Sequence, residues 1–124
     1  MPRIRFLRIL SLLLSLAICS AQAATLAERA HAAMLRVEVR PDQEAQFEKI
    51  MDDYYQRCTA MMRRETNSSP DDVDTRVPRL MRTIAKDTTS KMQKLLDPKQ
   101  MEAFQYALDL ENRRFLQDYG VKEP

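Results

Sequence analysis

Glycine occurs only once in this chain, at Gly120, and tryptophan is absent from all 124 residues. Ala, Leu, Met, Gln, Glu, Lys and Arg dominate the composition, and these residues favour helix. Apolar residues recur at steps of three and four, which is typical of helical faces. Proline and aspartate mark the breaks between these segments. The sequence therefore predicts an all-α fold.

The first 23 residues have the three parts of a secretory signal. A basic region with three arginines precedes an apolar run over 9–18, and Ala21-Gln22-Ala23 matches the small-x-small cleavage rule. The run is too short to favour a retained transmembrane helix, and Ile18 before Cys19 argues against a lipid anchor. We expect cleavage near Ala23, secretion of the mature chain without a stable membrane anchor, and one helical domain over 24–124.

The charge of the predicted mature chain is close to zero. All 18 acidic residues but only 17 of the 20 basic ones follow Ala23, which leaves a net charge of 17 − 18 = −1. This balance gives no support for nucleic-acid binding or for electrostatic attachment to a membrane.

Four helices are predicted, and the second has the clearest apolar stripe: Phe47, Met51, Tyr54, Cys58 and Met61. Pro78 disfavours helical conformation at Val77, so the third helix is expected to begin at Pro78. A short helical turn is expected before it, capped by Ser69 with Pro70 in the first turn. Gly120 provides a C-terminal stop. The expected helices are 25–37, 41–65, 78–96 and 98–119.

Two of the helix starts resemble each other at an offset of 57 residues. Val39-Arg40-Pro41-Asp42-Gln43 precedes Phe47, and Leu96-Asp97-Pro98-Lys99-Gln100 precedes Phe104. In the second copy Asp97 can cap the helix and Gln100 can reach back to the Asp97 amide, which forms a capping box. Arg40 caps poorly in the first copy. Two independent capped helix starts would also explain the similarity.

The pattern of signal, motif, long helix, acidic linker and second motif resembles the Spy/CpxP-like periplasmic family, whose two LTxxQ motifs each open a helix. The motif positions here are Val39, Arg40 and Gln43, then Leu96, Asp97 and Gln100. The resemblance implies a bent helical hairpin of about four helices that pairs into an antiparallel, cradle-like homodimer. It also implies an ATP-independent chaperone or stress-response protein for partly unfolded envelope proteins. The alternative is a regulatory protein that docks on a membrane sensor of envelope stress, and that sensor could be metal-responsive.

The candidate contact residues for clients or partners are Tyr55, Met62, Tyr106 and Leu110. Most methionines lie on apolar stripes, so core packing is the favoured interpretation, although flexible methionine also suits adaptable contacts. On the fourth helix Tyr106 and Leu110 lie opposite the main stripe. We expect this second patch to be exposed in a monomer and to serve as a docking surface.

No catalytic residues, metal ligands or cofactor are predicted. One histidine and one glycine cannot supply a catalytic triad, a phosphate loop or a metal cage. His31 is expected on the surface of a helix. Cys58 is the one thiol left after cleavage, and its position favours burial over an intermolecular disulfide. A binding protein is therefore favoured over an enzyme, and a purely structural helical module remains a third possibility.

Overall fold

The computed structural model describes residues 24–123, which form four helices and no strand. The all-α prediction is confirmed. The predicted signal peptide lies outside the described residues. The helices are α2 (Leu26–Leu35), α3 (Glu44–Ser68), α4 (Val73–Gln93) and α5 (Pro98–Asp118).

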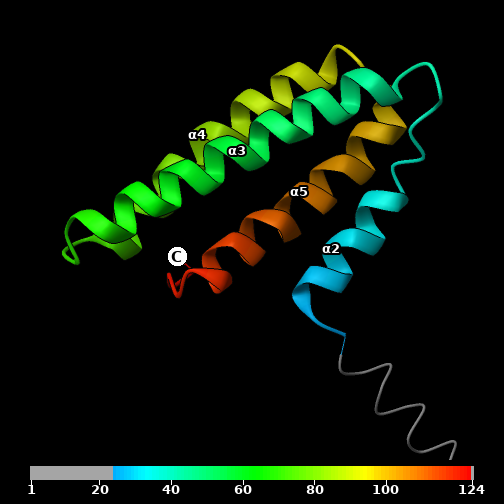
Figure 1. The fold of residues 1–124 in the computed structure, drawn as a ribbon. Helices are drawn as coiled ribbons and strands as arrows, with labels where there is room; N and C mark the ends of the chain where they lie inside the picture. Colours follow the sequence, from blue (N-terminus) through cyan, green and yellow to red (C-terminus); the bar gives the residue numbers. More distant parts are fainter. Residues whose placement is uncertain (1–23, 124) are drawn as a thin grey trace, which may run out of the picture.

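The helices α3 and α4 form an antiparallel hairpin, and α5 returns along α4 from the open end of that hairpin (Figure 1). The short α2 packs against α5 (Figure 1). Side chains of α3 also reach α5, so the main core is enclosed by the three long helices. This arrangement brings the starts of α3 and α5 together at one end of the molecule (Figure 1).

The capping box predicted at the start of α5 is confirmed. Asp97 Oδ1 accepts from the Gln100 amide at 2.8 Å, and the Asp97 amide donates to Gln100 Oε1 at 3.0 Å. At the other end Gly120 has a φ of +68°, and the Val121 amide donates to the Leu116 carbonyl at 2.9 Å. Glycine adopts this left-handed conformation without strain, so the predicted stop at Gly120 is also confirmed.

The start of α3 differs from the prediction, because the helix begins at Glu44 rather than 41 and continues to Ser68 rather than 65. Gln43 Oε1 accepts from the Arg40 amide at 3.1 Å, which is one half of a capping box. Arg40 has no side-chain acceptor to complete the other half. Residues 41–43 therefore form a turn before the helix begins. α2 also ends at Leu35 instead of 37, and Glu38 follows with a φ of 54°.

The predicted break at Pro78 is wrong, because α4 runs continuously from Val73 through Pro78. Proline removes the hydrogen bond that the Asp74 carbonyl would accept, but Val77 and Pro78 are both buried, and their packing offsets this loss. Ser69 Oγ accepts from the Asp71 amide at 3.4 Å, as a cap would, but no helix begins at Pro70. The residue before the helix is Asp72, in a left-handed conformation with φ 62° and without a side-chain cap bond.

The loop between α3 and α4 is held instead by Arg76. Its Nε donates to Glu65 Oε2, and its Nη1 donates to the Asp71 carbonyl at 2.9 Å. Its Nη2 lies 3.4 Å from the Ser69 carbonyl. One guanidinium therefore bridges the end of α3 and the loop, which supports a turn that contains no glycine.

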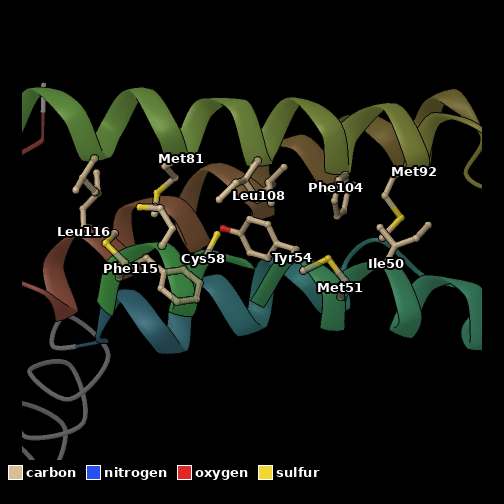
Figure 2. Close-up of a cluster of buried hydrophobic side chains, with 14 of the residues drawn as sticks. Ile50, Met51, Tyr54, Cys58, Met81, Met92, Phe104, Leu108, Phe115 and Leu116 are labelled. Carbon is tan, nitrogen blue, oxygen red and sulfur yellow. The ribbon is translucent and has the colours of Figure 1, made fainter. Parts of the chain in front are cut away.

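The core is rich in sulfur and aromatic rings. Figure 2 shows Tyr54 and Cys58 of α3 directed into the same interior as Met81 of α4 and Leu108 of α5. Tyr54 donates its hydroxyl hydrogen to Asn112 Oδ1 at 2.6 Å, which satisfies this buried group. Core packing of methionine is confirmed for six of the seven that follow residue 23: Met51, Met61, Met62, Met81, Met92 and Met101.

Four charged side chains join α3 and α4 on the surface. Arg57 Nη1 lies 2.5 Å from Asp87 Oδ2, and Lys91 Nζ lies 3.2 Å from Asp87 and 3.4 Å from Asp53. The hydrogen bond from Lys91, followed by that from Arg57, lowers the pKa of Asp87 below its ordinary value of 3.8. The folded state therefore favours the charged carboxylate.

We expect Asp87→Asn to reduce the acid sensitivity of the fold. A pKa lowered by folding contributes stability above the ordinary value near 3.8, and that contribution is lost as pH falls through the lower folded pKa. Urea unfolding at pH values on either side of this window measures the effect. Asp52→Asn removes an exposed carboxylate of α3 that lies outside this network of ion pairs, and it serves as the matched control. Equal pH dependence in Asp87→Asn and the parent would contradict the assignment.

Candidate functional site

The side chains of Gln43 and Gln100 form a buried pair that joins the two motifs. Gln100 Nε2 donates to Gln43 Oε1 at 2.9 Å, and Gln43 Nε2 lies 3.3 Å from Gln100 Oε1. The two residues are only 2% and 7% exposed. Side-chain amides at this burial need partners for all their polar atoms, so the pair fixes the relative position of the two helix starts.

Each glutamine also binds two backbone groups. Gln43 bonds the Arg40 amide and the Leu95 carbonyl, while Gln100 bonds the Asp97 amide and the Glu38 carbonyl. Each backbone partner of Gln43 lies 57 residues from the corresponding partner of Gln100, and this is the offset between the two motifs. Each amide therefore uses both acceptor positions and both donor hydrogens, the full capacity of the group.

The same equivalence continues along α3 and α5. Phe47 and Phe104 meet edge to face, with ring centroids 6.1 Å apart. Met51 and Leu108, one turn further along, are both buried in the main core. The sequence predicted two similar helix starts, and the structure shows that they contact each other directly.

All six motif positions lie in this junction. Leu96 is buried and Val39 is partly buried against the main core, while Asp97 caps α5. Arg40 lies outside the core and pairs with Asp42 at 3.2 Å. The motif residues therefore have structural roles that can be read from their contacts. Three of them, Arg40, Asp97 and Gln100, also line a neighbouring groove.

An open groove of about 650 Å³ lies between α2 with its following loop and the first half of α5. Its apolar lining includes Ala33, Val37, Ala103 and Tyr106. Charges of both signs surround this lining: Arg36, Glu38, Arg40, Asp97, Lys99 and Glu102. The groove therefore offers apolar contact area with polar groups of either sign close by.

Tyr106 and Leu110 do not share an exposed surface. Tyr106 is 54% exposed at the groove, but Leu110 is only 2% exposed, so the prediction that Leu110 is exposed in a monomer is wrong. Leu110 packs with Ala30, Ala33 and Ala107 in a small cluster between α2 and α5. The short alanine side chains allow α2 to approach α5 closely and cover that part of the second patch.

Two other candidate contact residues lie wholly or partly in the core. Met62 is fully buried, so its predicted role in client contact is not compatible with this fold. Tyr55 is half-buried, and its ring lies 5.4 Å from that of Tyr54. Burial, followed by the nearby Glu111 carboxylate, raises the pKa of Tyr55 to about 12. Tyr55 therefore keeps its proton at neutral pH.

Cys58 is fully buried, as predicted from its position on the apolar stripe. Burial raises the pKa of its thiol to about 12, and this effect exceeds the lowering by the Tyr54 hydrogen bond and by the nearby arginines. The reactive thiolate is therefore scarce at neutral pH. This environment does not support the alternative of an intermolecular disulfide.

His31 lies exposed on α2, as expected. Within residues 24–123 no group of three His, Cys, Asp or Glu side chains is placed to hold a metal ion. None of the four described helices is long and apolar enough to cross a membrane. Comparison with known proteins gave no match: no family model, curated protein or solved structure aligns with this chain.

We expect Gln43→Ala and Gln100→Ala each to lower the free energy of unfolding by roughly 2–4 kcal/mol, because each leaves buried polar groups without partners. Urea denaturation measures the change. The double variant should lose less than the sum of the single losses, since neither amide then remains unpaired. Gln46→Ala, exposed on α3, should change stability by less than about 0.5 kcal/mol. Additive single losses would argue against coupling within the pair.

Leu110→Ala should destabilise the fold by about 2–5 kcal/mol, because it opens a cavity between α2 and α5. Tyr106→Ala should cost far less, since more than half of this side chain is exposed. Thermal unfolding of both variants compares the two positions. A stability loss for Tyr106→Ala as large as that for Leu110→Ala would contradict the division of the second patch into core and surface.

Proposed function

We propose that this chain is a Spy/CpxP-like protein that binds partly unfolded envelope proteins without ATP or a cofactor. In this proposal residues 1–23 direct export to the periplasm and are then removed. The remaining chain acts as a holdase, which keeps client segments soluble through many weak contacts. The resemblance of the two motifs supports the proposal, together with the open groove beside them.

The groove at Tyr106 is the observation on which the proposal depends most. Tyr106 and Leu35 are the large hydrophobic side chains most exposed among residues 24–123, and only Tyr106 lines the groove. The ring of a tyrosine can contact apolar side chains while its hydroxyl group stays hydrogen-bonded to water. The pair of Gln43 and Gln100 fixes the backbone at Glu38, which lines the groove. This part of the groove is therefore ordered before a client segment binds, which lowers the entropic cost of binding.

The mixed rim fits a binder of low specificity. Arg36 and Lys99 have no ion-pair partner among the described residues, and neither do Glu38 and Glu102. Such side chains can form hydrogen bonds or ion pairs with the polar groups that flank an apolar client segment. The homodimer is also part of this proposal, as an antiparallel cradle, and it rests on the family resemblance alone.

Aggregation of two unrelated unfolded clients, followed by light scattering without ATP, tests the proposal. The protein lacking residues 1–23 should suppress scattering of both clients near a stoichiometric ratio. Tyr106→Ala should raise the amount needed for half suppression about threefold or more, as the loss of one aromatic contact implies. Leu35→Ala removes an exposed apolar side chain of α2 that does not line the groove, so it serves as the matched control.

Absence of suppression for both clients would overturn the holdase proposal. Saturable binding to one membrane sensor domain would then favour the regulatory alternative. Equal weakening by Tyr106→Ala and Leu35→Ala would show that the groove is not the client site, even if the protein suppresses aggregation.

A further inference from the structure

The outer face of α4 carries a row of cations that neither the fold nor the groove uses. Arg79, Arg82 and Lys86 follow one another at steps of three and four, so they lie on one face of the helix. The buried residues of α4, including Met81, Ile84 and Thr88, lie on the opposite face. All three cations are exposed and have no ion-pair partner among residues 24–123.

A fourth exposed cation lies on α3 at a similar level along the hairpin. The ion pairs Arg57–Asp87 and Asp53–Lys91 fix the register of the hairpin, and in this register Arg63 lies near the level of Arg79 and Arg82. Arg63 is exposed and also has no ion-pair partner in the described part of the chain. The three cations that share one face of α4, Arg79, Arg82 and Lys86, are called the cationic surface below.

Apart from Asp71, Asp72 and Asp74, which lie at the start of α4 before Arg79, acidic residues are separated from most of this surface. Four of them lie in the first half of α3: Glu44, Glu48, Asp52 and Asp53. Asp87 of α4 already forms ion pairs with Lys91 and Arg57. Glu123 and Asp109 line a hollow with Arg82, but Asp109 pairs with Arg113. Because charges in physiological salt are screened beyond about 8 Å, local charge governs contact even when net charge is near zero.

We propose that the cationic surface docks reversibly on an anionic phospholipid bilayer. The three cations of α4 span about two turns of a straight helix, so they can face a plane at the same time. No large exposed hydrophobic side chain accompanies them, whereas protein interfaces usually centre on buried aromatic or apolar anchors. An array of point charges without an anchor therefore fits a fluid layer of phosphate headgroups better than a specific protein partner.

Co-sedimentation with vesicles tests this proposal. The protein lacking residues 1–23 should bind vesicles of phosphatidylglycerol and phosphatidylcholine, should not bind phosphatidylcholine alone, and should dissociate at high salt. Arg79→Gln, Arg82→Gln and Lys86→Gln together should lower the partition coefficient about tenfold or more. The control triple Arg29→Gln, Lys49→Gln and Lys94→Gln makes the same change in net charge at exposed positions elsewhere. It should stay within about twofold of the parent.

Three outcomes would overturn the proposal: no binding of the parent to anionic vesicles, equal binding to neutral vesicles, or equal losses in the two triple variants. A polyglutamate arm separates lipid from acidic protein. Binding of the parent to polyglutamate but not to anionic vesicles would overturn lipid docking and assign the surface to acidic polypeptides. Unchanged urea unfolding of both triple variants shows that any loss of binding does not come from unfolding.

Discussion

The hydrogen-bonded pair of Gln43 and Gln100 is the contact on which the arrangement of the helices depends. Each amide is saturated, and its partners come from the other motif as well as from its own helix start. Since these groups are buried, a displaced α3 or α5 would leave several of them without partners. The pair therefore selects one relative position of two helices that are far apart in the sequence, and apolar packing alone would not be so selective.

Much of the local structure could be predicted from the sequence, because it depends on short-range chemistry. The start of α5 followed from Asp97 and Gln100, and its end followed from Gly120. The start of α3 was misplaced because Arg40 supplies only half of the same box. The continuity of α4 through Pro78 was missed because packing of distant residues, rather than local preference, decides it.

The candidate site was harder to predict, since it depends on which helix covers which face. Leu110 was expected on the surface, but the small side chains of Ala30 and Ala33 bring α2 over it. Those alanines, spaced three apart on α2, were the one signal in the sequence that could have suggested a close helix contact. The groove could not be inferred at all, because its walls come from α2, the following loop and α5. The near-zero net charge also gave no sign that the cationic surface of α4 lies apart from the acidic residues in the first half of α3.

The way α2 is attached has a consequence for the motions of the molecule. Its contact with α5 rests largely on Ala30, Ala33, Ala107 and Leu110, a cluster separate from the main core. The chain just after α2 is held more firmly, because the Glu38 carbonyl is bonded by Gln100 and Val37 is buried in the main core. We therefore expect α2 to unfold locally while its C-terminal end stays attached, so that its amides exchange with solvent before those of the long helices. Detachment of α2 would widen the groove without opening the main core.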